Sequence, residues 1–354
     1  MDGFSSDLPT ILINWYDRHK RLLPWRSRSG AKSDPYHVWL SEIMLQQTTV
    51  ATVKGYFDQF IVRWPTINDL ANARLDDVLH AWQGLGYYAR ARNLYKCAQV
   101  VVGEFDGRFP SEEEELLKLP GVGPYTAAAV AAIAFNQAAT PVDGNIERVI
   151  SRLYRISEPL PAAKRAIKAR AEAVTPSSRC GDYVQAVMDL GATICTPRKP
   201  SCSLCPWRQH CAAFSAGDAV AFPKKAPKKK KPTRLGVAFW LEDRHGRILL
   251  RRREESGLLG GMMEFPSTEW SEGKWQNNEA LAAAPLKTDW QMVTGAVTHT
   301  FTHFHLKLTV FKGRSHEERE PNGVWCEVEK FGEHALPTVM KKIAHHVLGR
   351  EGRG

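Results

Sequence analysis

The sequence predicts a mainly α-helical first part, up to about residue 214, followed by a smaller α+β part. Alanine-rich amphipathic segments, interrupted by Gly and Pro, fill the first part. The stretch FPKKAPKKKKPTR (222–234), with six Lys, one Arg and three Pro, then has the composition of a linker. Beyond it, segments such as RLGVAFWLED and HTFTHFHLKLTVFKG have the pattern of strands. DRHG (243–246) predicts a hairpin turn, and residues 337–348 predict a closing helix.

Composition and charge favour a nucleic-acid partner. The 48 Lys and Arg exceed the 38 Asp and Glu, which gives a formal net charge of +10 and favours binding to a polyanion. The first ten residues, MDGFSSDLPT, lack the basic and apolar regions of a signal peptide. The longest apolar run, residues 127–135, is far shorter than the roughly 20 residues that cross a bilayer. We therefore expect a cytoplasmic protein of a bacterial nucleoid without a membrane partner, and the Lys-rich stretch leaves a nuclear location open.

Four cysteines lie within 17 residues, in the pattern C-x6-C-x2-C-x5-C, at Cys195, Cys202, Cys205 and Cys211. Four thiolates so close together can bind one tetrahedral zinc or one cubane cluster. Zinc sites more often contain two C-x-x-C pairs, so the single pair here favours a [4Fe–4S] cluster over zinc. Arg198 and Lys199 lie in the loop between the first two cysteines, where they are either phosphate ligands or solvated loop charges.

An acidic residue, Glu42, stands inside the apolar run YHVWLSEIMLQQTTV (36–50). At helical spacing it shares one face with Gln46 and Thr49. The opposite, core-facing stripe is apolar: Trp39, Leu40, Ile43, Met44 and Val50. Because glutamate is rarely buried without a partner or a task, Glu42 is either a surface charge or a carboxylate held in a pocket for chemistry.

The stretch LPGVGPYTAAAV (119–130) is a turn with two glycines that leads directly into a helix. Gly121 and Gly123 allow backbone N–H groups to converge on an anion at the helix N-terminus. A lone G-x-G is most often only a tight turn. Preceded by an amphipathic helix at 111–118, however, this segment resembles the helix-hairpin-helix that grips a DNA backbone.

The hairpin, the acidic loop PVDGN and the four cysteines occur in the order found in the helix-hairpin-helix DNA glycosylases with an iron–sulfur cluster. Within that superfamily, WLSEIMLQQT, GLGYYARARNL, LPGVGPYTA and VDGNIERV resemble the adenine DNA glycosylases, strongly over residues 8–214 and more loosely over 234–350. The resemblance implies a monomeric base-excision repair enzyme with a [4Fe–4S] cluster. Its partner would be double-stranded DNA with adenine mispaired with 8-oxoguanine or guanine.

The resemblance also implies a domain organisation. We expect a six-helix barrel with the helix-hairpin-helix over residues 31–135, and an iron–sulfur domain built from residues 1–30 and 136–214. A basic linker would cover 215–233, and a Nudix-like domain that reads 8-oxoguanine would cover 234–350. The Nudix metal motif R-E-x2-E-E-x-G is absent after GLLGGMMEFPS, so hydrolysis of nucleoside diphosphates is not expected.

Breaking an N-glycosidic bond calls for one carboxylic acid to protonate the base and one carboxylate to face the sugar cation. The resemblance assigns the first role to Glu42, whose pKa apolar neighbours would raise, and the second to Asp143. Asp143 also precedes a helix and could simply be its N-cap. Asn145 would help to order the sugar or the water. Tyr125 stands where strand-cutting relatives carry a Lys that forms a Schiff base, so the resemblance implies a monofunctional glycosylase.

Further residues are assigned by the same resemblance. The adenine pocket would contain Arg21, Trp25 and Asp189. The duplex would be wedged by Gln47 and Tyr87, and its backbone bound by Gly121, Gly123, Arg198 and Lys199. The loop that reads 8-oxoguanine would contain Phe301, Thr302 and His303.

Alternatives remain open. The first is a glycosylase with lyase activity for oxidised pyrimidines on the same scaffold, and the second is a non-enzymatic DNA-binding or redox-sensing protein. The three histidines at 299, 303 and 305, which period two would place on one side of a strand, suggest zinc, but no Cys or acid lies nearby in the sequence.

Overall fold

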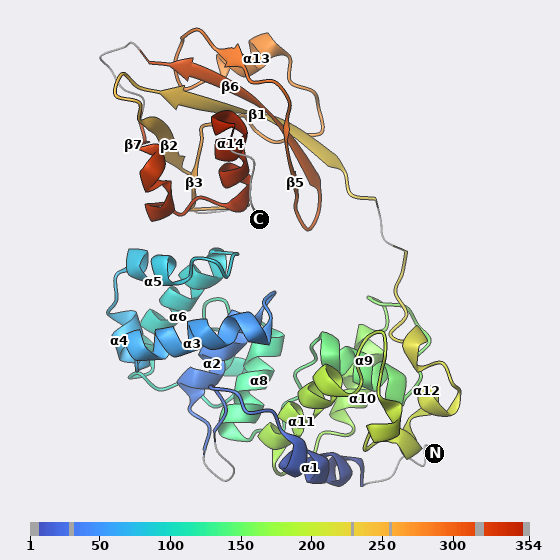
Figure 1. The fold of residues 1–354 in the computed structure, drawn as a ribbon. Coiled ribbons are helices and arrows are strands. Elements are labelled where there is room, and N and C mark those ends of the chain that lie inside the picture. The colour runs from blue at the N-terminus through green and yellow to red at the C-terminus, as the bar shows by residue number, and fades with distance from the viewer. Residues whose placement is uncertain (1–6, 28–31, 228–229, 255–256, 316–321, 350–354) are drawn as a thin grey trace. The chain divides into compact units, whose positions relative to one another are not determined.

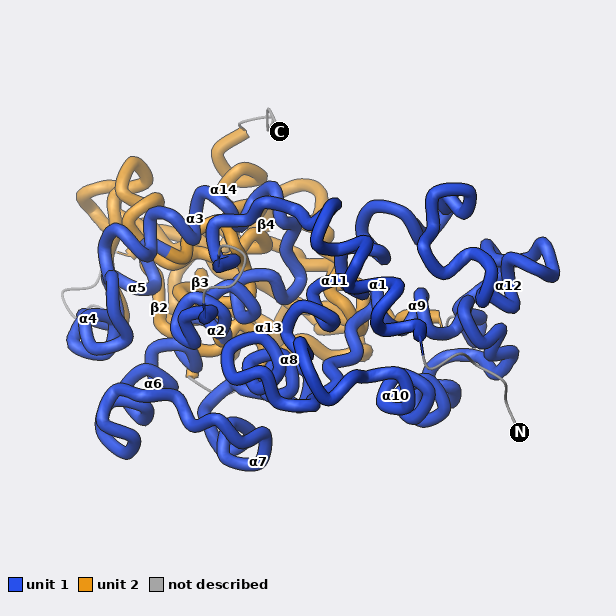
Figure 2. Tube along the Cα trace, turned by 90° about the horizontal axis from the view of Figure 1, so that it is seen from below, with its two compact units in different colours: residues 1–81, 90–227 blue, residues 82–89, 228–354 orange. Residues whose placement is uncertain are grey.

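The computed structural model describes residues 7–27, 32–227, 230–254, 257–315 and 322–349. The chain divides into two compact units (Figure 2): residues 1–81 with 90–227, and residues 82–89 with 228–354. Across the described ranges, no helix is long and apolar enough to span a membrane.

The first unit is helical (Figure 1), which confirms the prediction from the sequence. Its α-helices are α1 (Leu8–His19), α2 (Pro35–Leu45), α3 (Val50–Arg63), α4 (Ile67–Ala71), α5 (Leu75–Ala81), α6 (Ala89–Glu104), α7 (Glu113–Leu116), α8 (Pro124–Phe135), α9 (Gly144–Leu153), α10 (Lys164–Glu172), α11 (Cys180–Thr193) and α12 (Ala212–Ser215). Three short 3-10 helices accompany them: η1 (Cys202–Leu204), η2 (Arg208–His210) and η3 (Ala219–Ala221).

Helices α8 and α11 form the centre of this unit. The sequence of α8 is apolar on all sides, and every residue from Thr126 to Ala132 is buried. It packs against α2 and α11, and α11 packs in turn against α1 and α9. The N-terminal helix therefore lies beside a helix from the end of the unit, and these contacts bring distant parts of the chain to one site.

Helix α2 ends at Leu45, earlier than the apolar run predicts. Gln47 adopts a left-handed conformation with φ 60°, and the side chain of Thr49 accepts a hydrogen bond from the backbone N–H of Thr52 as the N-cap of α3. The prediction that Glu42 and Thr49 share one helical face is therefore wrong, because Thr49 starts a new helix.

Part of the predicted linker, residues 215–233, is folded onto the helical unit. Phe222 is buried, with 3% of its surface exposed. The backbone N–H of Leu160 donates a 2.8 Å hydrogen bond to the carbonyl of Lys224. The apolar Phe222 and this backbone pairing hold the segment as far as residue 227, and residues 228–229 lie outside the described part of the chain.

The second unit contains a mixed β-sheet (Figure 1). Its elements are β1 (Thr233–Glu242), β2 (Ile248–Arg252), β3 (Met263–Glu264), α13 (Asn277–Ala282), β4 (Gln291–Met292), β5 (Val297–Thr300), β6 (His305–Arg314), β7 (Val324–Cys326), η4 (Val328–Glu333) and α14 (Thr338–Leu348). The main path through the sheet is β3-β2-β1-β6-β4, with β5 paired to β6 and β7 to β2. Strands β1 and β6 are parallel, and the β1–β2 turn and the closing helix confirm the predictions from the sequence.

The two faces of this sheet bury separate cores. Ala238 and Trp240 of β1 pack with α14 on one face, whereas the alternate residues Val237 and Phe239 pack near α13 on the other. This follows from the period of two along a strand. A strand can alternate in this way and still be apolar throughout when both of its faces are covered.

The segment HTFTHFH is not one strand. His299 lies on β5 and His305 on β6, and residues 301–304 form the turn between these antiparallel strands. The backbone N–H of Phe301 donates a 2.9 Å hydrogen bond to the carbonyl of Phe304 across the turn. His299, His303 and His305 therefore do not share one side of a strand, contrary to the expectation from period two.

Candidate active site

Glu42 lies in the last turn of α2 and is buried, with 6% of its surface exposed. The hydroxyl of Tyr125, in the first turn of α8, donates a 2.9 Å hydrogen bond to Glu42 Oε2. Burial raises the pKa of Glu42 to about 7. The Tyr125 hydrogen bond and the charge of Arg26 oppose this rise, whereas the charge of Asp143 adds to it. Glu42 is therefore partly protonated near neutral pH, as a proton donor must be.

A cavity of about 50 Å³ lies beside Glu42. Arg21 and Trp25, which were expected to line an adenine pocket, both border it. Its walls also include residues that were not expected from the sequence, namely Arg26, Gln185 and Met188. The last two are on α11, the helix that carries Asp189, and no local pattern in the sequence marked them.

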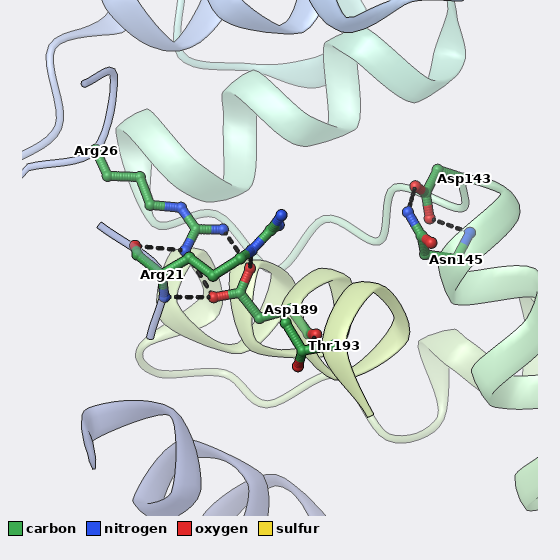
Figure 3. Close-up of polar contacts among 6 residues, drawn as sticks. All are labelled: Arg21, Arg26, Asp143, Asn145, Asp189 and Thr193. Atoms are coloured by element: carbon green, nitrogen blue, oxygen red, sulfur yellow. Dashed lines mark hydrogen bonds and ion pairs between the residues drawn. The ribbon is translucent and has the colours of Figure 1, made fainter. Parts of the chain in front are cut away.

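Asp189 lies behind this cavity rather than in its wall. Its carboxylate is fully buried and accepts hydrogen bonds from the backbone N–H of Arg21 (3.0 Å), from Arg21 Nε (2.6 Å) and from both terminal nitrogens of Arg26 (2.8 Å each), as Figure 3 shows. Burial alone would raise the pKa of Asp189, but the hydrogen bonds and charges of the two arginines lower it. Asp189 therefore anchors to α11 the loop that carries Arg21, Trp25 and Arg26.

Asp143 is the N-cap of α9, one of the two roles that the sequence left open for it. Its Oδ1 accepts hydrogen bonds from the backbone N–H groups of Asn145 (2.9 Å) and Ile146 (2.7 Å), and its Oδ2 accepts one from Asn145 Nδ2 (2.8 Å; Figure 3). These bonds fix the carboxylate at the positive end of the helix dipole. Its charge also raises the pKa of Glu42, so Asp143 lies within electrostatic reach of that carboxyl group.

Arg148 connects Asn145 to the cysteine region. Its Nη2 donates to Asn145 Oδ1 at 2.9 Å and to the carbonyl of Gly191 at 2.7 Å, and its Nε donates to the carbonyl of Cys195 at 2.7 Å. A single guanidinium therefore joins the start of α9, the end of α11 and the first cysteine. The sequence alone did not single out Arg148. Two of these partners, Gly191 and Cys195, lie 43 and 47 residues away in the chain, and the third, Asn145, is on its own helix.

The four predicted cysteine ligands come together around one small cavity, lined by Cys195, Cys202, Cys205 and Cys211. No set of three or more His, Cys, Asp or Glu side chains in the described residues is placed to hold a single metal ion. Four thiols that line one cavity can together bind a single metal cluster, with one thiolate on each iron.

A buried arginine supports the same conclusion. Arg152 has 2% of its surface exposed, and among the described residues its side chain donates hydrogen bonds to backbone carbonyls and to Cys195 Sγ, which lies 3.3 Å from Nη1. A buried cation requires a compensating charge. No ion pair between Arg152 and a carboxylate occurs in the described part of the chain, so an anionic thiolate cluster would supply that charge.

The glycine turn leads into α8 as the sequence predicts. Gly121 has φ 76°, and a Cβ placed there would lie 2.6 Å from Asn93 Cβ, so the position requires glycine. Gly123 is the N-cap of α8 and has no atom within 4 Å of an added Cβ. Gly121 is exposed in the turn directly before the start of α8, and a helix N-terminus can bind an anion.

The other residues expected to touch DNA are exposed. Gln47 and Tyr87 both have left-handed backbones, with φ 60° and φ 49°, and 58% of the surface of Tyr87 is exposed. Such conformations are uncommon outside glycine and concentrate at functional sites. Arg198 and Lys199 are exposed in the loop between the first two cysteines.

Among the residues expected to read the opposite base, Thr302 and His303 are exposed at the β5–β6 turn, and Phe301 is half-buried beside them. The turn therefore presents a hydroxyl and an imidazole outward.

Three family models match the chain. A model of the HhH-GPD superfamily of base excision DNA repair proteins matches residues 40–176, the iron-sulfur binding domain of endonuclease III matches residues 195–211, and a NUDIX domain matches residues 237–346. The second of these covers all four cysteines. Together with the fit of the thiols and Arg152, this match identifies the cysteine region as a [4Fe–4S] site.

Similar proteins cover nearly the whole chain. The adenine DNA glycosylase of Homo sapiens is 36% identical over 96% of this chain and 74% of that protein. The adenine DNA glycosylase of Buchnera aphidicola subsp. Schizaphis graminum is 33% identical over 94% of this chain and 96% of that protein. Among solved structures, a thermostable thymine-DNA glycosylase is similar with a TM-score of 0.53 and 33% identity, over 59% of this chain and 95% of that one.

Proposed function

Because the chain belongs to the adenine DNA glycosylase family, we propose that it hydrolyses the N-glycosidic bond of adenine mispaired with 8-oxoguanine or guanine in double-stranded DNA. It is a DNA N-glycosylase, and its substrate pairing and the roles of its residues are our proposal. The observation that supports it best is the buried Glu42, whose pKa is raised to about 7 by burial and in part by the charge of Asp143.

The chemistry divides between these two groups. Adenine is a poor leaving group, so Glu42 delivers its proton to a ring nitrogen of the base, most simply N7. As the bond to the sugar breaks, positive charge develops on the deoxyribose, and the Asp143 carboxylate faces it. Three hydrogen bonds hold that carboxylate in place, and the one from the Asn145 side chain also orients the amide toward the sugar or the attacking water.

Tyr125 determines the outcome after the base has left. A lyase forms a Schiff base between a lysine amine and C1′ of the sugar, and it then cuts the strand. The phenol of Tyr125 cannot form an imine, and it is already hydrogen-bonded to Glu42. We therefore propose that the product is an intact strand with an abasic site.

Binding requires the adenine to leave the base stack, at a cost of a few kcal/mol. Phosphates of the DNA would be bound by Gly121, Gly123 and the loop with Arg198 and Lys199. These contacts would offset the cost of unstacking the adenine. Gln47 and Tyr87 would fill the gap in the stack. When bound, the [4Fe–4S] cluster supplies a rigid support for the basic loop between its ligands.

Recognition of the opposite base is assigned to the second unit. The exposed Thr302 hydroxyl and His303 imidazole can hydrogen-bond the Hoogsteen edge of 8-oxoguanine, and Phe301 supports them. The family resemblance implies the same role for residues 301–303.

The proposal is tested by single-turnover excision on three duplexes, with adenine opposite 8-oxoguanine, guanine or thymine. Each product is divided and analysed with and without alkali. We expect fast adenine loss opposite 8-oxoguanine, slower loss opposite guanine, and strand breaks only after alkali. Breaks without alkali would instead indicate the lyase for oxidised pyrimidines, and no adenine loss would refute the proposal.

A matched variant tests the proton donor. Glu42→Gln keeps the size and one hydrogen-bond acceptor of the side chain but carries no proton for the base. It should bind the duplex like the parent chain and lose excision. Retained excision would remove Glu42 from its proposed role.

A further inference from the structure

Phe301 is anchored in an aromatic cluster of the second unit. Its ring centroid lies 5.8 Å from that of Trp270, 4.6 Å from that of His299 and 4.9 Å from that of Phe304. The Nζ of Lys231 donates a 3.0 Å hydrogen bond to the carbonyl of Phe301. The position of the β5–β6 turn therefore depends on the rings behind Phe301, since the next two residues are exposed.

Trp270 is the fixed member of this cluster. A Cβ added to Gly236 of β1 would lie 2.6 Å from Trp270 Cδ1, so the indole packs directly on the backbone of the sheet. The guanidinium carbon of Arg253 lies over the indole ring, 5.1 Å from its centroid. Arg253 is held in turn by an ion pair with Glu264, a carboxylate with 2% of its surface exposed that also binds Arg251 at 2.7 Å.

The indole N–H of Trp270 plays no part in this arrangement. Its Nε1 is buried and has no hydrogen-bond partner among the described residues. A buried donor without a partner is unfavourable, and a phenylalanine would not have this cost. What Trp270 contributes is therefore its flat ring, which faces Phe301 at an interplanar angle of 31°.

We propose that Trp270 is a positioning residue that sets the preference of this chain for 8-oxoguanine over guanine opposite the excised adenine. The proposal rests on the function proposed above. A continuous line of contacts runs from the buried Glu264 through Arg253 and Trp270 to Phe301, and from there to the exposed Thr302. If the ring at 270 is lost, Phe301 loses its support and the turn samples more positions. The hydroxyl then meets the lesion less often, so excision opposite 8-oxoguanine slows, whereas excision opposite guanine is unaffected.

The test measures single-turnover excision of adenine opposite 8-oxoguanine and opposite guanine, and takes the ratio of the two rates. Because both rates come from one preparation, the ratio is independent of the fraction of folded protein. Trp270→Leu should lower the ratio by about three- to tenfold, the equivalent of one aromatic contact. Trp270→Phe should keep most of it, because a ring remains against Phe301.

Two controls separate positioning from general stability. Trp290 packs at 5.1 Å against Phe239 in the core on the other face of the sheet, so Trp290→Leu should leave the ratio unchanged. In a Phe301→Ala background, Trp270→Leu should have no further effect, since its influence passes through Phe301. An unchanged ratio in Trp270→Leu would overturn the inference, and so would an equal fall in Trp270→Phe or Trp290→Leu. If the parent chain excised no adenine, or showed no preference, the proposed function itself would have failed.

Discussion

The hydroxyl of Tyr125 donates a 2.9 Å hydrogen bond to Glu42 Oε2 and so joins the start of α8 to the end of α2. Burial raises the pKa of Glu42. Two effects lower it, namely this hydrogen bond, which favours the ionised form, and the charge of Arg26, and the hydrogen bond is the larger of these two. The balance leaves the pKa at about 7, where a carboxyl group can both hold and release a proton near neutral pH. Tyr125 therefore tunes the group that we propose as the proton donor.

Replacement of Tyr125 by Phe should shift the pH dependence of excision. The variant loses the hydrogen bond that favours the carboxylate, so the pKa of Glu42 should rise further above 7. In the parent chain the single-turnover rate should fall as the pH rises through about 7, because Glu42 loses its proton. In Tyr125→Phe the fall should occur at higher pH. As a control, Tyr183→Phe changes a buried tyrosine whose hydroxyl has no partner in the described residues, and it should leave the profile in place. A midpoint that stays or moves down in Tyr125→Phe would contradict the assignment.

The same group makes stability depend on pH. The pKa of Glu42 is about 7 in the folded chain, against 4.5 as the ordinary value, so the folded state holds this proton more tightly. Its stabilising contribution is complete below pH 4.5 and is lost as the pH rises through about 7. The loss corresponds to about 3 kcal/mol of the free energy of unfolding. As the pH rises from 5 to 8, the free energy of unfolding of Glu42→Gln should therefore increase relative to that of the parent chain by up to this amount. Urea unfolding at each pH measures the difference. A constant difference across that range would show that Glu42 is ionised throughout.

Much of the site could be predicted from the sequence because its signals are local. Glu42 interrupts an apolar helix, and Asp143 directly precedes a helix start. Arg26, Gln185 and Met188 could not be predicted in this way. Gln185 and Met188 reach the cavity because α11 packs against α1 and α8, and Arg26 is held there by Asp189 of α11. These contacts join residues far apart in the chain.

Besides the early end of α2, two features of the fold differ from the prediction, and each has a physical reason. HTFTHFH alternates like a strand and contains no Gly or Pro to mark the turn, which forms because the ring of Phe301 packs into an aromatic cluster. The Lys-rich composition around 222–234 hides Phe222, a single apolar residue that holds part of the segment against the helical unit. Charge composition describes the average of a segment, whereas its attachment here depends on one side chain.

Asp189→Asn should destabilise the first unit strongly. The fully buried carboxylate balances the guanidinium groups of Arg21 and Arg26, and the variant would leave these charges without a counter-charge. Breaking a buried ion pair on one side costs about 3–5 kcal/mol. Asp182→Asn is the matched control on the same helix, since it removes one exposed partner of Arg179 and should cost at most about 1 kcal/mol. Urea unfolding of the two variants provides the comparison, and equal losses would show that Asp189 is not the anchor of this loop.

Arg148→Met should reduce excision without releasing the cluster. The variant removes the hydrogen bonds to Asn145 Oδ1 and to the carbonyl of Cys195, so the amide that binds Asp143 loses its support. Losing a residue that orients a functional side chain typically costs 10- to 100-fold, and we expect a fall in single-turnover rate of about that size. Iron content and visible absorbance should remain, because Arg152 holds Cys195 independently. Equal loss of iron and activity would mean that Arg148 acts on the cluster alone. The exposed Arg155→Met serves as the control.

Gly121→Ala should weaken duplex binding, whereas Gly103→Ala should not. At Gly121 the backbone has φ 76° and the added Cβ would lie 2.6 Å from Asn93 Cβ, so the turn must move. A strained or displaced turn of this kind costs about 1–3 kcal/mol, and roughly tenfold weaker binding corresponds to the lower part of that range. At Gly103 of α6 the same methyl group meets no atom within 4 Å, and no contact with DNA is proposed for this residue, which makes it the control.

The measurement is titration of a duplex in which the target adenosine cannot be cleaved, followed by single-turnover excision at saturating protein. If the hairpin only grips the backbone, Gly121→Ala should lose affinity but keep its excision rate once bound. Asn93→Gly in the same chain should restore part of the affinity, because it removes the atom that the new methyl group meets. Equal affinities for the two alanine variants would show that the turn at Gly121 does not contact the duplex. A loss of excision rate at saturation would show instead that the hairpin acts through Tyr125, four residues further along the chain.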